Sequence, residues 1–286
     1  MQIKKKLNSL DKLYIFFFSI VLFIIISIPT TSRANLFEIS DIEIIEPFKL
    51  NFDKEKVIDK GFQKAFTRLI SIITTSDDKN KIKNTSLSTI KRLVDSFIIS
   101  EETFINNEYH VKFDVNFSKK NTLSFLENKN IFPSIPKRKK ILLIPILIDV
   151  KQNKVLFHSE NIFYNDWNKE NEKYYLLEYI LPNEDLEDIN ILSKNILSIE
   201  DYDFKEIITK YDIDDYIITI IYKNNDELRI LSKIKLNRFF KVDNKKLEKI
   251  DLNKEKDLKL VFLALKNTYE NYWKKTNQIN TSIKLP

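Results

Sequence analysis

Few side chains in this protein are of types that do chemistry, and they are scattered. There are two histidines, His110 and His158, and no cysteine among 286 residues. A nucleophilic site needs a nucleophile, a base and an orienting group that meet in space. Ser159 follows His158 in the sequence, but neighbours along a chain do not by themselves supply that geometry. We therefore expect no catalytic residue and interpret both histidines as ordinary surface or half-buried imidazoles.

The best polar cluster is a run of carboxylates formed by Glu184, Asp185, Glu187 and Asp188. Carboxylates bind calcium when loop oxygens alternate around a glycine turn, and this run has neither the spacing nor the glycine. No metal site is therefore predicted. Acidic side chains at the start of a helix interact favourably with its dipole. The run is predicted to begin a short helix, and a partner-binding or cation-binding patch at these four residues is the alternative.

Composition excludes several other classes of site. The absence of cysteine excludes disulfides, thiol catalysis and Cys-ligated metals. Phosphate-binding loops need several glycines, and this chain has one, Gly61, so no cofactor is expected. The net charge is +6, of which residues 1–34 carry five basic and one acidic side chain, a net of +4, leaving +2 for the other 252 residues. Such a balance does not favour a nucleic-acid partner.

The first 34 residues have the pattern of a secretory signal peptide. A lysine-rich start precedes the uncharged residues 13–28, and Ser32 and Ala34 place small side chains at the −3 and −1 positions of a cleavage site. As a helix the apolar run would span about 24 Å, short of a hydrocarbon core of roughly 30 Å. We expect a cleaved signal peptide at 1–34 and a periplasmic protein. An uncleaved anchor in the inner membrane, with the rest of the chain facing the periplasm, is the alternative.

Residues 36–130 are predicted to form a first α+β domain. Residues 109–117 alternate apolar and polar side chains, which indicates a half-buried strand, and a turn at Asn106-Asn107 would pair it with residues 95–105. The other expected elements are a strand at 36–48, a helix capped by Asp53 with a wide apolar stripe, a loop at 74–85, a short helix around Ile90 and a helix capped by Ser118. Gly61 lies beside the stripe and should allow a neighbour to approach. This order predicts an antiparallel sheet with helices on one face.

Residues 131–140 form the expected linker, with two prolines and the basic block 137–140. The next residues, 141–150, read ILLIPILIDV. A short apolar run without alternation is typical of a strand covered on both faces. Pro145 cannot donate to a sheet ladder, so a bulge or one free edge is expected there.

Residues 141–275 are predicted to form a second domain with a mixed sheet and helices on both faces. Two early β-α-β steps indicate parallel strands, and a late hairpin adds antiparallel ones. The further elements expected are a helix at 160–170, a strand at 175–181, a helix capped by Asp203, a hairpin at 213–222 and 227–239, a strand near 247–250 and a last helix carrying Tyr269, Tyr272 and Trp273. The tail at 276–286 is expected to be disordered.

Several segments resemble an uncharacterised exported proteobacterial family, catalogued as domain of unknown function two thousand and sixty-six. They are IDKGFQKAFTRL, YHVKFDVNFS, RKKILLIPILID, LPNEDLEDINIL and IITKYDIDDYIITIIY. The second half is also similar in architecture to the amino-terminal domain of TolB. The first resemblance implies export and no activity, and the second gives only an analogy of fold.

Together these features predict an exported cell-envelope protein that binds another envelope protein without catalysing a reaction. One alternative is a hydrolase whose site is assembled from scattered Asp, Glu, Ser and His side chains. The other is a membrane-surface protein that contacts lipid through its N-terminal segment and the basic block 137–140, since basic side chains attract anionic headgroups.

Overall fold

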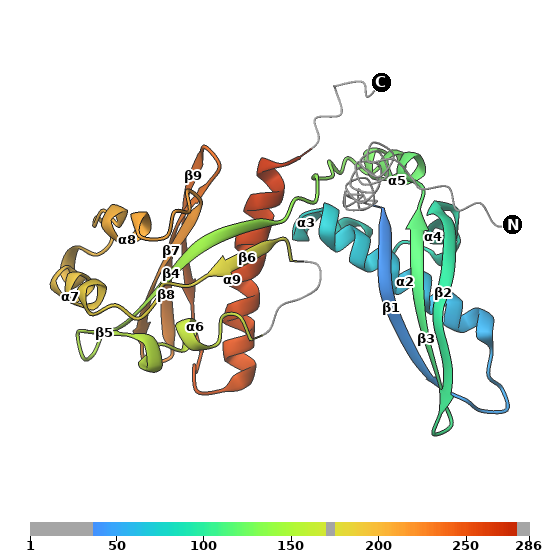
Figure 1. Ribbon diagram of the computed structural model, residues 1–286, viewed down its shortest axis with the longest axis horizontal. Helices are drawn as coiled ribbons and strands as arrows, with labels where there is room; N and C mark the ends of the chain where they lie inside the picture. Colours follow the sequence, from blue (N-terminus) through green and yellow to red (C-terminus); the bar gives the residue numbers. More distant parts are fainter. Residues whose placement is uncertain (1–36, 170–174, 279–286) are drawn as a thin grey trace, which may run out of the picture. The chain divides into compact units, whose positions relative to one another are not determined.

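The structure, a computed structural model, describes residues 37–169 and 175–278. The expected signal peptide at 1–34 and residues 279–286 of the expected tail lie outside these residues. The disorder expected at 276–278 is wrong, because Thr276 ends a helix and Gln278 forms a β-bridge with Ser134. The described residues have an α+β fold, with a three-stranded antiparallel sheet followed by a mixed six-stranded sheet, as predicted (Figure 1). They belong to one compact unit, and the division into domains at 131–140 stays a prediction.

The first sheet has the strand order β1-β3-β2. Its strands are β1 (Glu38–Pro47), β2 (Val94–Ile105) and β3 (Glu108–Phe117). The alternation in β3 is confirmed, because every second residue from Tyr109 to Phe117 is buried. Asn106 and Asn107 have φ angles of 52° and 61°, so the predicted turn between β2 and β3 uses the left-handed conformation that Asn tolerates.

Four helices accompany this sheet: α2 (Lys54–Ile73), α3 (Ser76–Ile82), α4 (Leu87–Leu93) and α5 (Lys119–Glu127). The caps predicted at Asp53 and Ser118 are confirmed, since each side chain accepts a hydrogen bond from a first-turn amide. The prediction of a loop at 74–85 is wrong, because these residues contain α3. This helix has almost no apolar pattern, and it begins where the side chain of Thr75 accepts a hydrogen bond from the amide of Asp78.

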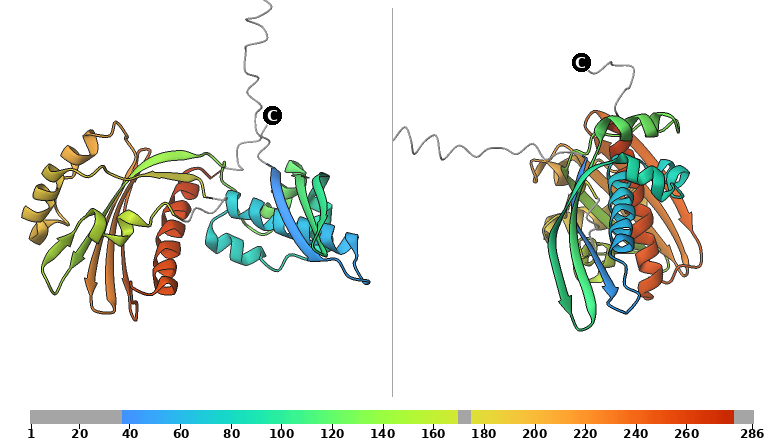
Figure 2. Two further views of the ribbon diagram at one scale, coloured as in Figure 1. Left: turned by 60° about the horizontal axis from the view of Figure 1, so that its bottom comes forward. Right: turned by 90° about the vertical axis from the view of Figure 1, so that its right-hand side faces the viewer.

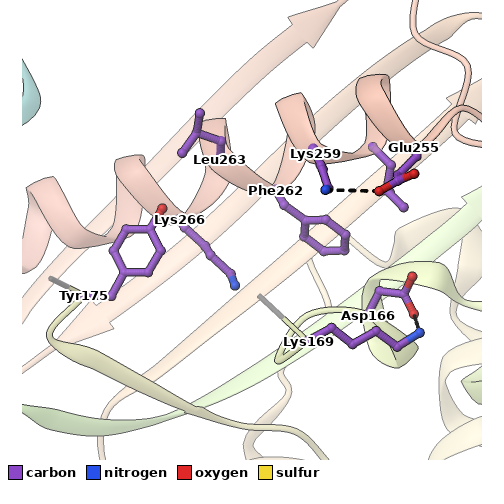
Figure 3. A pocket seen from close by; sticks show the side chains of 9 residues that line it. Asp166, Lys169, Tyr175, Glu255, Lys259, Phe262, Leu263 and Lys266 are labelled. Atoms are coloured by element: carbon purple, nitrogen blue, oxygen red, sulfur yellow. Dashed lines mark ion pairs between the residues drawn. The ribbon is translucent and has the colours of Figure 1, made fainter. Parts of the chain in front are cut away.

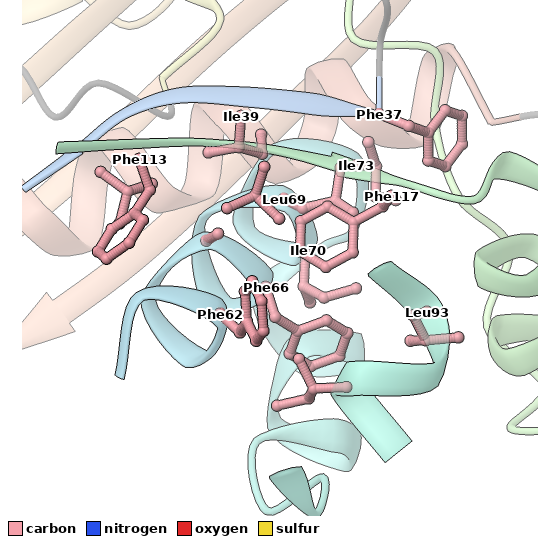
Figure 4. Close-up of a cluster of buried hydrophobic side chains, with 14 of the residues drawn as sticks. Phe37, Ile39, Phe62, Phe66, Leu69, Ile70, Ile73, Leu93, Phe113 and Phe117 are labelled. Atoms are coloured by element: carbon pink, nitrogen blue, oxygen red, sulfur yellow. The ribbon is translucent and has the colours of Figure 1, made fainter. Parts of the chain in front are cut away.

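The first core lies between α2 and the sheet, where aromatic and aliphatic side chains interdigitate (Figure 4). Gly61 faces the ring of Phe113 so closely that a Cβ atom there would lie 2.9 Å from two ring carbons. This contact confirms that Gly61 serves close packing of the helix on the sheet.

The second sheet runs β5-β4-β7-β8-β9, with β6 also paired to β4. Its strands are β4 (Lys139–Asp149), β5 (Lys154–Leu156), β6 (Leu177–Ile180), β7 (Tyr216–Asn224), β8 (Glu227–Leu236) and β9 (Phe239–Leu247). β4 is parallel to β6 and β7, whereas β5, β8 and β9 pair antiparallel. The predicted mixed sheet is confirmed. The strand predicted near 247–250 is wrong, because the last strand, β9, begins after a turn at Asn237 and already ends at Leu247.

β4 is buried on both faces, as predicted. Ile141 and Leu143 pack into the core on one face, and Leu142 and Ile144 pack into the core on the other. Pro145 lies where one edge of β4 has no partner strand, since β6 pairs only as far as Leu142 and β5 begins only at Leu147. The missing N–H of Pro145 therefore disturbs no ladder there.

Helices cover both faces of this sheet (Figures 1 and 2). α6 (Ile162–Asn165) and α9 (Glu255–Thr276) contribute to one core, and α7 (Leu186–Lys194) and α8 (Lys205–Thr209) to the other. The helix predicted at 160–170 is only the single turn of α6, because Asn161 starts it and Asp166 ends it. Among the described residues no helix is both long and apolar enough to cross a membrane.

Candidate functional site

The predicted carboxylates cluster around a lysine of the same chain. Asp185 caps α7, as its side chain accepts from the amide of Glu187 at 2.8 Å, so the predicted helix start is confirmed. The Nζ atom of Lys210 lies 2.8 Å from Asp185 Oδ2, 2.6 Å from Asp188 Oδ1 and 3.4 Å from Glu187 Oε2. Three of the four predicted residues therefore surround a cation that the chain itself supplies.

The ion pairs shift the ionisation of this cluster. Hydrogen bonds with Asp185 first and Asp188 second raise the pKa of Lys210 well above its ordinary 10.5. The hydrogen bond from Lys210 lowers the pKa of Asp185 below its ordinary 3.8. Because the pKa of Lys210 is raised, its ion pairs stabilise the fold fully when the pH is below 10.5. This contribution is lost as the pH rises through the raised pKa. The contribution of Asp185 is present above 3.8 and is lost as the pH falls through the lowered value.

Replacing this lysine should destabilise the protein. In Lys210→Met, Asp188, which is 7% exposed, loses the ammonium bound to Oδ1. We expect the free energy of unfolding at neutral pH to fall by about 1–2 kcal/mol, less than for a fully buried pair because Lys210 is partly exposed. Urea titration measures this, and Lys205→Met, an exposed lysine at the start of α8, is the control. The difference in unfolding free energy between Lys210→Met and the unsubstituted protein should shrink in acid, where Asp185 becomes protonated. A difference that stayed constant would contradict a stabilising role of the Lys210 ion pairs.

A small cavity lies beside this cluster, at a point where chain connections diverge. The connection from β4 to β6 passes through α6 on one face, and the connection from β6 to β7 passes through α7 and α8 on the other. In parallel sheets, ligands bind in the crevice that such a divergence opens beyond the carboxyl ends of the strands. The cavity has a volume of about 40 Å³ and is lined by Ile144, Pro145, Phe157, His158, Asn161, Tyr164, Pro182, Asn183, Asp188, Ile189, Leu192 and Ile207. We call it the switch-point cavity.

One side of the switch-point cavity is held rigid by Asn161. Its Nδ2 donates to the carbonyl of Pro145 at 2.9 Å, which fills the gap between β6 and β5. Its Oδ1 accepts from the amides of Phe163 and Tyr164 at the start of α6. Tyr164 in turn donates its hydroxyl to the carbonyl of Pro182 at 2.5 Å, which links the two diverging connections.

Two residues that line the cavity each have a polar atom that is buried and has no hydrogen-bond partner among the described residues. These atoms are Nδ1 of His158 and Oδ2 of Asp188. The carboxylate of Glu184, the fourth predicted residue, has its Oε1 4.0 Å from this Nδ1, too far for a hydrogen bond. His158 also has a φ of 38°, and strained backbone of this kind clusters at functional sites. The carboxylate cluster was predicted from the sequence. Lys210 and His158 are distant in the sequence, and only the fold brings them next to these carboxylates.

Neither histidine contacts a nucleophile in the part of the chain that the structure describes. Nε2 of His110 lies 3.3 Å from Glu108 Oε2 at the start of β3, and the ring of His158 packs edge to face on Tyr164. No hydrogen bond from either imidazole to a serine, threonine or tyrosine hydroxyl is present among residues 37–169 and 175–278. The same ranges hold no group of three or more His, Asp or Glu side chains arranged to bind a metal ion.

A larger cavity of about 310 Å³ lies beside α9 (Figure 3). Phe262 and Tyr175 contribute apolar walls, and Lys259 pairs with Glu255 at 3.0 Å. Lys266 is almost fully buried there, and its Nζ donates to the carbonyl of Trp167 at 2.7 Å. The cationic side chains of this cavity therefore have partners within the chain.

Two further charged side chains lie on the buried face of α9, at intervals of four residues from Lys266. Glu270 is 1% exposed, and its Oε1 accepts from the amides of Leu176 and Leu177 at 2.9 and 2.8 Å. Lys274 donates to the carbonyl of Ser71 at 2.6 Å. Burial raises the pKa of Glu270 and lowers that of Lys274. Sequence reasoning missed this stripe, because charged residues in a helix normally indicate its solvent face.

The edges of the first sheet differ in how they are covered. On β1, the carbonyls of Glu43 and Ser40 accept hydrogen bonds from Lys64 and Arg68 of α2. β2 has no lysine or arginine, and ten of its twelve residues are exposed. By contrast β9, the long edge of the second sheet, carries Lys241, Lys245 and Lys246, a common protection against strand pairing.

β2 also exposes large apolar side chains. Ile98, Phe104 and Ile105 are 67%, 59% and 52% exposed. Phe104 packs on Phe48 at a ring distance of 5.1 Å, and the adjacent Leu50 is fully exposed. Exposed apolar side chains that gather at one place mark interaction sites in soluble proteins. We call Phe48, Leu50, Phe104 and Ile105, which lie near the turn between β2 and β3, the apolar end of the first sheet.

Comparison with known proteins leaves the family open. No protein-family model matches this chain, and no curated protein matches it. The resemblance to the exported proteobacterial family and the likeness to the TolB domain therefore stay predictions.

Proposed function

We propose that this protein is an exported, non-enzymatic accessory module of the cell envelope that binds an extended segment of another envelope protein along β2. The observation that carries the proposal is the asymmetry of the first sheet. On one edge, β1, two carbonyls accept hydrogen bonds from α2, whereas no described strand pairs with the outer edge of β2, which also exposes apolar side chains. A partner strand gains backbone hydrogen bonds from such an edge, and its alternate side chains gain apolar contacts.

The pairing of β2 with β3 indicates which part of the edge receives the partner. Register shifts fall between Val94 and Ser96 and between Ile99 and Glu101, and bulges of this kind interrupt pairing. From Glu101 to Ile105 the register is regular, and this stretch adjoins the apolar end of the first sheet. The partner segment therefore pairs mainly with residues 101–105 and places apolar side chains on Phe104 and Ile105.

Export is the second component of the proposal, and the pattern of residues 1–34 supports it. Cleavage after Ala34 would leave a protein that begins at Asn35. The N-terminal mass of the protein from its host tests this directly. A mass that starts at Asn35 supports export, and an intact chain dissolved in cytosol contradicts it.

The docking edge is tested by placing a charge on it. Ile105→Lys changes an exposed side chain within residues 101–105, so the fold should be retained while an apolar partner is repelled. The full chain is cross-linked in envelope extracts, and captured proteins are compared with those of Leu186→Lys, an exposed leucine at the start of α7. We expect Ile105→Lys to lose the captured partner and Leu186→Lys to keep it.

Hydrogen exchange on the complex locates the contact. Protection of the amides of residues 101–105 on partner binding supports strand addition. Recovery of the protein always alone, or a partner retained equally by both variants, contradicts the proposal. Sedimentation with lipid vesicles that Ile105→Lys abolishes would assign the apolar surface to a membrane instead and also overturn it.

A further inference from the structure

We propose that one end of the second sheet is a docking surface for a membrane of anionic phospholipid. It is the end at which β4 and β7 begin and at which the chain turns from β8 into β9. Two features that the function proposed above does not use lie there. One is the basic block 137–140, and the other is the turn with the first residues of β9, 237–241, which we call the hairpin tip.

The hairpin tip exposes an aromatic ring on each of its two faces. Phe239 and Phe240 are 44% and 58% exposed, and consecutive residues of a strand point to opposite faces of the sheet. A protein that packs on one face of a hairpin covers only one of two such rings. Lipid headgroups surround a tip that enters between them, to a depth of about 5–10 Å for interfacial helices. A membrane therefore covers both rings.

Basic side chains lie directly beside the rings. Lys235 lies opposite Phe240 in the ladder between β8 and β9, and Lys241 is the next residue of β9. In the described part of the chain neither Lys235 nor Arg238 forms an ion pair. Their charged groups lie 5.4 and 5.5 Å from the ring centres of Tyr216 and Phe239. Aromatic rings with adjacent basic side chains match a membrane surface, where aromatic rings sit at the level of the headgroups and anionic headgroups attract basic residues.

The fold joins the basic block to the hairpin tip through one buried carboxylate. Asp215 is 2% exposed, its Oδ2 lies 2.6 Å from Nζ of Lys139, and its Oδ1 accepts from the amide of Asn237. Trp273 also holds the block, because its Nε1 donates to the carbonyl of Lys137 at 2.8 Å. The block and the tip are distant in the sequence and are fixed at the same end of the sheet.

Positive charge is concentrated at this end. Residues 137–140 and 233–245 carry nine basic side chains and one acidic side chain. Four further carboxylates lie beside them, those of Glu178, Asp212, Asp214 and Asp215. Nine positive and five negative charges leave +4 here. Since residues 35–286 carry +2 in all, −2 is left for the rest of that stretch. This polarity turns the docking end toward anionic headgroups, and each basic side chain near the surface adds to the attraction.

The test measures lipid contact at single positions of the full chain. Phe240→Trp keeps an aromatic ring at the tip, and the two tryptophans of the chain, Trp167 and Trp273, are buried. With vesicles of phosphatidylcholine and brominated phosphatidylglycerol, we expect saturable quenching of the Phe240→Trp fluorescence. Leu50→Trp, at the fully exposed leucine of the apolar end of the first sheet, is the matched control and should not be quenched.

The role of charge is tested in the Phe240→Trp chain. Arg238→Gln should raise the lipid concentration for half-maximal quenching by roughly fivefold, and added salt should raise it as well. Lys256→Gln removes the same charge from an exposed lysine at the start of α9, which follows the opposite end of β9, and should change it by less than about twofold. Ile105→Lys should leave quenching unchanged, so this surface and the β2 edge are tested separately.

The proposal is overturned if Phe240→Trp is not quenched, if Leu50→Trp is quenched equally, or if vesicles of brominated phosphatidylcholine alone quench Phe240→Trp as well as the anionic ones. Capture of an acidic protein that depends on Arg238, from extracts free of membranes and without vesicle binding, would assign this end of the sheet to a polypeptide and also overturn it.

Discussion

Glu270→Ala should lose about 2–4 kcal/mol of unfolding free energy, because the substitution removes a buried acceptor of two backbone hydrogen bonds. The side chain accepts from the amides of Leu176 and Leu177 just where β6 begins. Truncation leaves two N–H groups without a partner at a site that water does not reach, since Glu270 is 1% exposed. Urea titration of the two proteins at neutral pH measures the loss.

Glu270→Gln is the control, because it keeps the accepting oxygen and removes only the charge. Burial raises the pKa of Glu270 above its ordinary 4.5. For an acid with a raised pKa, the stabilising contribution is present below 4.5 and is lost as the pH rises through the raised value. The stability of Glu270→Gln relative to the unsubstituted protein should therefore increase from acid to neutral pH. An equal loss in the Ala and Gln variants would contradict the role assigned to the two amide hydrogen bonds.

Asn161→Ala should lose about 2–4 kcal/mol, because three hydrogen bonds disappear from a side chain that is 2% exposed. The carbonyl of Pro145 loses its donor in the gap between β6 and β5, and two amides at the start of α6 lose their cap. The measurement combines urea titration with hydrogen exchange, in which the amides of Phe163 and Tyr164 should lose protection.

Asn165→Ala provides the comparison for this prediction. Its Nδ2 donates to the carbonyl of Ser159 in an exposed position, so its removal should cost less than about 1 kcal/mol. If both variants were equally stable, Asn161 would not be the residue that holds the edge of β4 and the wall of the switch-point cavity.

Elements with a strong local pattern were predictable from the sequence. The alternation in β3 predicts a strand with one buried face, and the apolar run of β4 predicts a strand buried on both faces. Asp53 and Ser118 mark the starts of the helices that they cap. Elements with a weak local pattern were not. α3 is polar throughout most of its length, and the turn at Asn237 that begins β9 has no glycine or proline to mark it.

The site was predictable only in part, for a different physical reason. Acidic residues that are adjacent in the sequence stay together in the helix start of α7, so the carboxylates were found. Lys210 and His158 lie more than twenty residues away from Asp188 in opposite directions, and only the crossing of two connections brings them to it. The buried charges of α9 were missed because their partners are backbone groups, which carry no signal in the sequence of side chains.

The capped β1 edge limits what can grow on the first sheet. A guest strand that joins β2 completes the sheet on that side, and on the other side Lys64 and Arg68 already bind two carbonyls of β1. Two copies that met through β2 would therefore turn their β1 edges outward. The occupied carbonyls on β1 oppose the continuation of pairing from molecule to molecule into a fibre.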